Sequence, residues 1–129
     1  MLFRSLKRTQ IIQRPRAKVF EFFADAGNLE RITPPELNFH IITPQPINIE
    51  KGCLIDYQLR LRGVPLTWKT EITQWNPPFD FVDSALKSPY KQWIHLHRFT
   101  ETSQNETVME DIVRYRLPLN LLGISPIGT

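Results

Sequence analysis

The chain has 129 residues, 41% of them apolar and 22% charged, and its 16 Lys and Arg against 13 Asp and Glu leave a net charge of +3. This apolar fraction excludes a disordered chain, and without a run of about 18 apolar residues we expect no integral membrane segment. The single Cys53 excludes an intramolecular disulfide and a zinc site built on Cys pairs. Charges interrupt the N-terminus where a secretory signal would be apolar, so we expect one cytoplasmic domain over residues 1–129.

Basic residues concentrate near the N-terminus, where six of the sixteen lie within the first eighteen positions. They alternate with apolar residues and form no sustained patch of the kind that binds phosphates. The alternation favours a solvated strand face followed by a helix start, so we expect no nucleic-acid partner. The five glycines are scattered, and we expect no cofactor of the nucleotide kind.

Prolines separate short runs that are rich in β-branched and aromatic residues. The pattern predicts a first strand over residues 2–12, a short amphipathic helix from Pro15 to Ala26 that Gly27 stops, and a helical turn from Asn28 to Thr33. Six further strands are predicted over residues 39–43, 52–61, 66–75, 79–86, 91–101 and 106–117. Short connections indicate an antiparallel meander, so the fold class is α+β with a curved seven-stranded sheet.

Alternation with a period of two assigns the faces of the later strands. Around the last hairpin, an even register places His95 and His97 beside Asp111, whereas an odd register places Glu110 and Ile112 there. We prefer the even register because it gathers the aromatic residues of both strands on one face. A curved sheet with a large apolar face and few helices to fill it predicts an enclosed cavity.

Several short motifs occur in a characteristic order, and together they resemble the SRPBCC branch of the START-like superfamily over about residues 2–122. The motifs are Val19-Phe20-x-Phe22-Phe23, Asn28-Leu29-x-x-Ile32-Thr33-Pro34-Pro35, Trp68-x-x-x-Ile72, Phe81-x-Asp83, Pro89-Tyr90-x-x-Trp93-x-His95-x-His97-x-Phe99 and Asp111-x-Val113-x-Tyr115-x-Leu117-Pro118. Bacterial members of this branch are often described as polyketide cyclase/dehydrase-like or ligand-binding proteins. The resemblance implies the helix-grip fold, in which a curved sheet wraps a long C-terminal helix around a hydrophobic cavity. Only residues 119–124 remain to begin that helix before Pro126, so we expect it to be truncated.

The shared parity of the strands predicts a ligand-binding face with aromatic, aliphatic and polar members. Its residues are Tyr57, Trp68, Ile72, Trp93, His95, His97, Asp111 and Tyr115. Two histidines and one carboxylate can hold a metal, but no further strong ligand is expected nearby, so we predict no metal site. The remaining interpretations are an acid–base pair and a satisfied polar cluster that orients a ligand, and the second is favoured.

Three classes of function follow. The preferred one is binding or transport of a hydrophobic small molecule, such as a lipid, quinone or polyketide-like compound, without turnover. The second is a cyclase or dehydratase that uses the His and Asp side chains. The third is a protein-interaction module: with a truncated helix, Trp68, Trp93 and Tyr115 are expected to form an exposed patch that a second copy covers in a homodimer.

Overall fold

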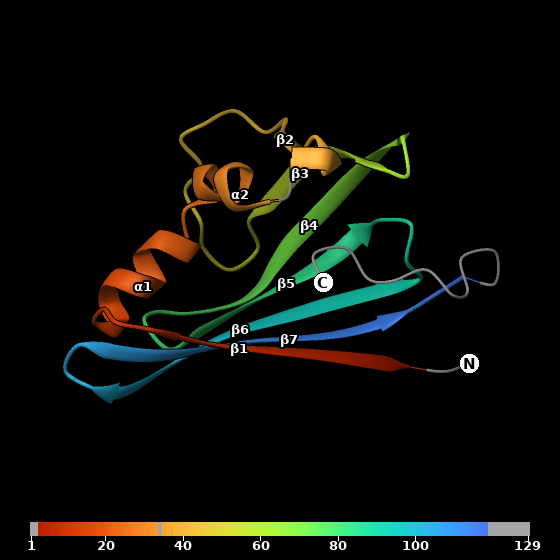
Figure 1. Cartoon of the computed structure of the whole chain (residues 1–129). Coiled ribbons are helices and arrows are strands. Elements are labelled where there is room, and N and C mark those ends of the chain that lie inside the picture. Colours follow the sequence, from red (N-terminus) through yellow and green to blue (C-terminus); the bar gives the residue numbers. More distant parts are fainter. Residues whose placement is uncertain (1–2, 34, 119–129) are drawn as a thin grey trace.

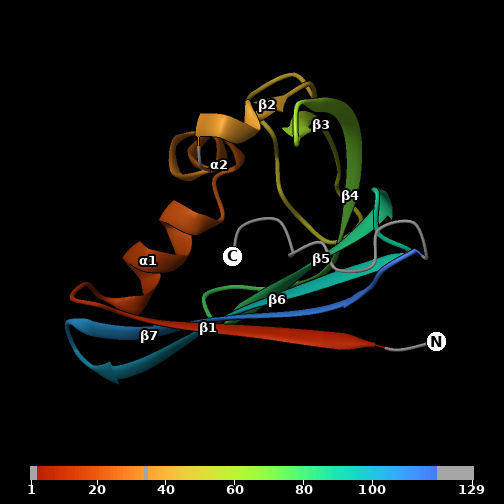
Figure 2. The same cartoon turned by 45° about the vertical axis from the view of Figure 1, so that its right-hand side comes forward.

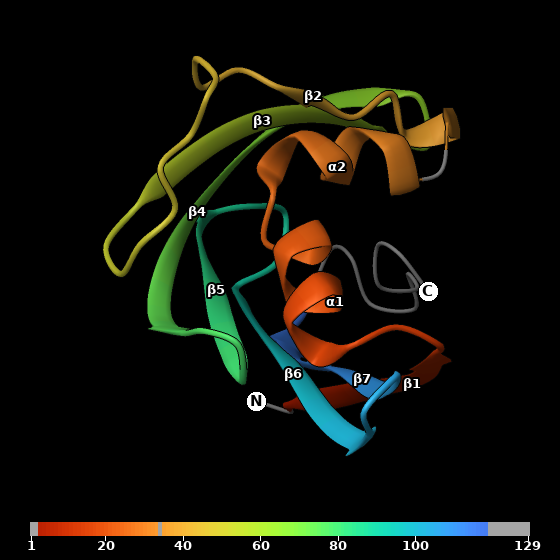
Figure 3. The same ribbon diagram turned by 90° about the vertical axis from the view of Figure 1, so that its left-hand side faces the viewer.

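A computed structural model describes residues 3–33 and 35–118 of the chain, except for the side chains of residues 30 and 32. Seven strands form one antiparallel sheet in the order β1-β7-β6-β5-β4-β3-β2. The sheet bends like a half-barrel, and the helices lie inside the curve (Figure 3). The predicted α+β architecture is therefore confirmed, whereas the expected truncated C-terminal helix falls outside the described residues.

The strands follow the predicted meander closely (Figures 1 and 2). They are β1 (Arg4–Ile12), β2 (His40–Ile41), β3 (Leu54–Leu61), β4 (Val64–Asn76), β5 (Asp80–Lys87), β6 (Gln92–Ser103) and β7 (Glu106–Arg116). The second strand is shorter than the predicted residues 39–43. Its pairing with β3 becomes irregular after Ile41. The Asp56 carbonyl accepts from the amides of both Ile42 and Thr43, at 2.8 and 3.2 Å, and the Asp56 amide donates to the Thr43 hydroxyl at 2.7 Å.

The two helices have different bounds from those predicted. α1 (Arg16–Phe23) ends before Ala26, and α2 (Ala26–Ile32) is a separate seven-residue helix, followed by a 3-10 turn at Pro35–Leu37. Asp25 makes the break, because its carboxylate accepts a hydrogen bond from the Gly27 amide at 2.9 Å and so caps α2. Gly27 therefore lies inside the second helix and does not stop the first. No described helix is long and apolar enough to cross a membrane.

An irregularity in β4 changes which side chains face inward. The register between β4 and β5 shifts between Ile72 and Gln74, so that Trp75 stands opposite Phe81. Trp75 then packs against Phe81 and against Phe20 of α1, with ring centroids 5.5 Å and 5.3 Å apart. Strict alternation assigns Trp75 to the other face, and the bulge brings it to the concave one.

The core consists of two clusters on the concave face. The first contains Leu59, Trp68, Tyr90, Trp93, Val113, Tyr115 and Leu117, and the second contains Val19, Phe20, Phe81, Phe99 and Met109. The expected exposed patch is wrong: Trp68, Trp93 and Tyr115 are only 2%, 7% and 7% exposed. Tyr90, from the turn before β6, packs against all three rings, and the homodimer inferred from that patch loses its basis.

A hydrogen bond from Thr107 connects the start of β7 to the segment that leads into α1. Its side chain is fully buried, and its hydroxyl donates to the Arg14 carbonyl at 2.8 Å. We predict that Thr107→Val lowers the free energy of unfolding by about 1–3 kcal/mol, because the shape is kept while a buried hydrogen bond is lost. Urea denaturation measures this change. Thr100→Val, at an exposed position of β6, is the matched control, and an equal loss in both variants contradicts the assigned role.

Candidate functional site

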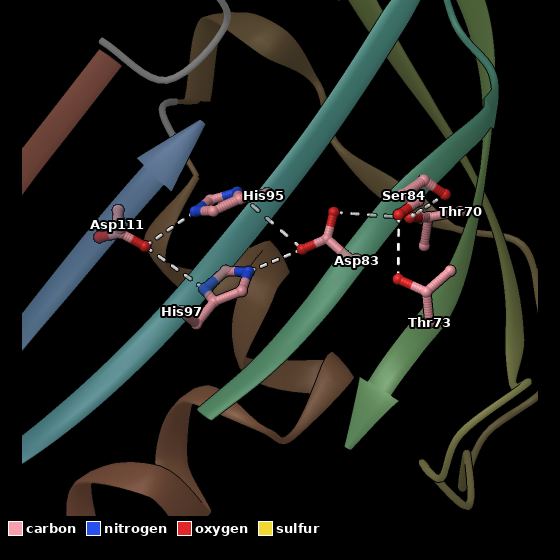
Figure 4. A network of polar contacts seen from close by, with 7 residues as sticks. All are labelled: Thr70, Thr73, Asp83, Ser84, His95, His97 and Asp111. Carbon is pink, nitrogen blue, oxygen red and sulfur yellow. Dashed lines mark hydrogen bonds and ion pairs between the residues drawn. The ribbon is translucent and has the colours of Figure 1, made fainter. Parts of the chain in front are cut away.

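Four polar side chains meet at the centre of the concave face, and we call them the His–Asp cluster: Asp83, His95, His97 and Asp111 (Figure 4). They come from three neighbouring strands, since Asp83 of β5 pairs with His95 of β6, and His97 of β6 pairs with Asp111 of β7. The even register predicted for the last hairpin is thus confirmed. Period-two alternation then points all four side chains to the same side of the sheet.

Each imidazole of the cluster spans the space between the two carboxylates. The Nε2 atom of His95 lies 2.9 Å from Asp111 Oδ1, and that of His97 lies 2.6 Å from Asp83 Oδ2. Because ionised carboxylates only accept, the imidazole N–H donates in both bonds. On the other side of each ring the contacts are looser. His97 Nδ1 is 3.3 Å from Asp111 Oδ1, at ion-pair distance but without the direction of a hydrogen bond, and His95 Nδ1 is 3.9 Å from Asp83 Oδ2.

Three rings of the site are stacked in a column. The His97 ring lies between those of Phe81 and His95, with centroid separations of 4.1 Å and 3.7 Å and interplanar angles of 13° and 19°. The flanking rings keep the His97 imidazole in one plane, while the carboxylates fix its rotation within that plane. The site is therefore organised before any ligand binds.

The charges of the cluster are strongly coupled. Burial disfavours the charged form of His97, but its contacts with Asp111 and Asp83 outweigh burial and raise the pKa of His97 to about 9. Burial alone would raise the pKa of Asp83 and of Asp111 as well. The hydrogen bonds and positive charge of the imidazoles reverse that effect and lower both carboxyl pKa values. At neutral pH the cluster thus holds an imidazolium between two carboxylates.

Asp83 is a member of the site that was not predicted from the sequence. The expectation that no further strong ligand lies near the histidines is wrong, since the ligating atoms of Asp83, His95 and His97 all lie within 4.8 Å of one another. The ring geometry nevertheless fits a metal poorly. An imidazole nitrogen binds a metal in the plane of its ring, and the two rings are nearly parallel and stacked, so their lone pairs do not converge. We therefore propose no metal site.

A cavity of about 690 Å³ opens above the cluster, between the sheet and the helices. Seven of the predicted ligand-binding residues line it: Tyr57, Trp68, Ile72, Trp93, His95, His97 and Asp111. Tyr115 does not line this cavity, and it packs beneath the lining against Tyr90 and Trp93. Further lining residues that the sequence analysis did not select include Arg8 of β1, Leu29 of α2, Leu37 and Asp83.

Tyr57 adds a hydroxyl to the cavity wall. Its ring lies between those of Phe39 and Trp68, with centroid separations of 4.6 Å and 6.0 Å. Burial, assisted by the negative charge of Asp83, raises the pKa of Tyr57 well above its ordinary value. The hydroxyl therefore stays protonated at neutral pH and can donate a hydrogen bond.

Comparisons with known proteins agree on the fold. No protein-family model and no curated protein sequence matches the chain. Among solved structures, it is similar to the Zhui aromatase/cyclase of Streptomyces sp. R1128, with a TM-score of 0.71 and 16% identity, over 88% of this chain and 68% of that one. It is also similar to a START superfamily protein of Mycobacterium smegmatis, with a TM-score of 0.71 and 7% identity, over 95% and 81% of the two chains.

A point mutant of norcoclaurine synthase from Thalictrum flavum, in complex with a transition-state analogue, shares the same fold. Its TM-score is 0.72 and its identity 10%, over 95% of this chain and 81% of that one. At such identities the likeness concerns the fold alone. The chain has the START-like helix-grip fold, as its motifs predicted, and the cavity lies between its sheet and its helices.

The coupled charges predict a pH dependence of stability. The folded-state pKa of His97, about 9, lies above its ordinary value of 6.5, so its contribution is complete below pH 6.5 and is lost as the pH rises through 9. We expect the free energy of unfolding to fall by up to about 3 kcal/mol across this range. The lowered carboxyl pKa values act oppositely, and their contribution is lost on acidification below about pH 4.

Urea denaturation at several pH values checks this expectation. His97→Gln should flatten the alkaline fall, while His40→Gln, which replaces an exposed histidine of β2, should keep it. An alkaline fall of the same size in His97→Gln contradicts the assignment, because another group would then be releasing the proton.

Proposed function

We propose that the protein binds a hydrophobic small molecule with one neutral polar group in the cavity above the His–Asp cluster. The observation that carries this proposal is the composition of the cavity wall, which is mostly aromatic and aliphatic, with the His–Asp cluster and a few other polar side chains among them. Cavities of a few hundred Å³ with apolar walls and few convergent polar groups are typical ligand sites. The folds of the similar structures support binding of this kind without specifying the ligand.

The charges of the site favour a neutral polar group over an ionised one. Asp83 and Asp111 carry negative charge, and protonated His97 balances one of them within the cluster. Arg8 stands opposite Asp111 in the register of β1 and β7 and also lines the cavity, so positive and negative charges are nearly equal there. An ionised ligand would lose its hydration without meeting net opposite charge. A hydroxyl or a carbonyl can instead exchange hydrogen bonds with Tyr57 and the carboxylates.

Binding can be tested with two probes that share one ring system. 1-Naphthol carries a neutral hydroxyl, and 1-naphthoate carries a carboxylate on the same rings. Trp68 and Trp93 line the cavity, so quenching of tryptophan fluorescence reports occupancy. We expect 1-naphthol to bind at least about tenfold more tightly than 1-naphthoate. Tighter binding of the carboxylate contradicts the proposed preference, and absence of binding by both contradicts a ligand site of this chemistry.

The contribution of the Tyr57 hydroxyl can be isolated by deleting one atom. We predict that Tyr57→Phe weakens 1-naphthol binding by about 2- to 10-fold, the effect of one lost hydrogen bond. Tyr115→Phe is the matched control, because Tyr115 is buried beneath the lining and does not line this cavity. Equal weakening in both variants indicates a general loss of packing and contradicts a direct role for Tyr57.

A cyclase- or dehydratase-type activity is the second candidate, and the geometry of His95 favours it. His95 Nε2 donates to Asp111, while His95 Nδ1 is 3.9 Å from its nearest carboxylate oxygen and makes no hydrogen bond there. In neutral His95 this nitrogen carries a lone pair at the floor of the cavity. A carboxylate that orients an imidazole base is a common arrangement for proton abstraction next to a carbonyl.

Exchange of carbon-bound protons for deuterium measures such proton abstraction directly. With 2-tetralone in D₂O, we expect the protein to accelerate exchange next to the carbonyl, because the enolate formed by His95 takes up a deuteron from solvent. Nuclear magnetic resonance follows the loss of the proton signal. His95→Gln should abolish the acceleration and retain binding. Exchange at the buffer rate with bound 2-tetralone contradicts the activity and leaves the binding function.

A further inference from the structure

A second hollow, of about 620 Å³, lies at the joint between α1 and α2, and we call it the outer hollow. On one side it is bounded by the residues between the two helices, and on the other by the chain that follows β2. Its lining residues are Ala24, Asp25, Ala26, Gln45, Pro46, Ile47, Ile49 and Trp75. The His–Asp cluster contributes nothing to this hollow, so the function proposed above does not account for it.

The outer hollow and the cavity share part of their walls. Ala24, Ala26 and Ile49 line both spaces, and we call these three residues the neck. Two of them are alanines, so only methyl groups project from the helix joint at this point. Small side chains at the neck obstruct the space between the cavity and the outer hollow less than larger ones would.

The chemistry of the neck is apolar. Its three side chains carry no polar atom, and Ile47, Pro46 and Trp75 extend the apolar wall into the outer hollow. Asp25 and Gln45 contribute polar side chains there, and the Asp25 carboxylate is engaged in capping α2 through the Gly27 amide. A polar group would lose its hydration at the neck, and a branched group would collide with the side chains there. An unbranched methylene chain is narrow and is stabilised by burial.

We propose that the two spaces form one passage and that the ligand is elongated, with its polar end at the His–Asp cluster and an unbranched hydrocarbon chain passing through the neck. This inference rests on the proposed binding function and specifies its ligand class. It assigns to Ala24, Ala26 and Ile49 a role in selecting a slender chain over a fused ring system at that end of the site.

Straight-chain primary alcohols of increasing length test the proposal. Each buried methylene should tighten binding by about fourfold, and the trend should continue for chains that extend beyond the cavity into the outer hollow. In Ala24→Leu, the larger isobutyl side chain at the neck should stop the trend at a shorter chain. Calorimetry gives the dissociation constants, and circular dichroism checks that the variants are folded.

Ile47→Trp provides a second variant that avoids the neck itself, because Ile47 lines only the outer hollow. It should likewise reduce affinity for the longest alcohols alone. Ala17→Leu, on an exposed position of α1, is the control and should behave as the parent protein. The proposed passage is contradicted if Ala24→Leu and Ile47→Trp both keep the full dependence of affinity on chain length. It is also contradicted if the affinity of the parent protein stops rising at short chains. If no alcohol of any length binds, the binding function itself fails.

Discussion

A protonated imidazole held between two carboxylates on neighbouring strands is the interaction on which the rest of the site depends. The His97 side chain is only 11% exposed, and a charge so deeply placed requires compensation within the protein. Asp83 of β5 and Asp111 of β7 supply it from opposite sides. These three neighbouring strands are thereby joined by charge as well as by backbone hydrogen bonds.

This compensation also sets the character of the cavity. Because the cluster satisfies most of its charge internally, the wall around it can remain aromatic and aliphatic without leaving an unpaired ion. The ring of Phe81 stacks on the His97 imidazole, so the polar cluster and the apolar wall of the cavity are in direct contact. The result is a site suited to molecules that are largely hydrophobic and carry a polar group without net charge.

Much of this arrangement could be predicted from period-two alternation. It indicated the strands, and the gathering of aromatic residues favoured the even register that brings His97 beside Asp111. Asp83 was not predicted as a site residue, although Phe81-x-Asp83 was one of the recognised motifs. Its strand pairs with β6 in a regular register that places Asp83 opposite His95, but the sequence pattern assigned a register only to the last hairpin and so did not relate Asp83 to the histidines. Trp75 departs from strict alternation because the bulge between Ile72 and Gln74 reverses the face of the residues that follow it.

Other differences arise from single side chains that act outside the regular elements. The carboxylate of Asp25 caps the second helix at Ala26, within the range that apolar periodicity assigned to the first helix. Tyr90 lies in a turn, yet it covers the aromatic rings that were expected to be exposed. Tyr115 has the parity of the binding face and is nevertheless buried below it, since parity gives the direction of a side chain but not its depth.

The protonation state of His97 is the most direct measurement of this account. Nitrogen chemical shifts of the imidazole rings, followed by nuclear magnetic resonance from pH 5 to pH 10, report whether each ring nitrogen carries a proton. We predict that both nitrogens of His97 remain protonated at pH 7 and that the ring titrates near pH 9. A His97 ring that is neutral at pH 7, with a pKa near its ordinary value of 6.5, would contradict the charge-compensated cluster.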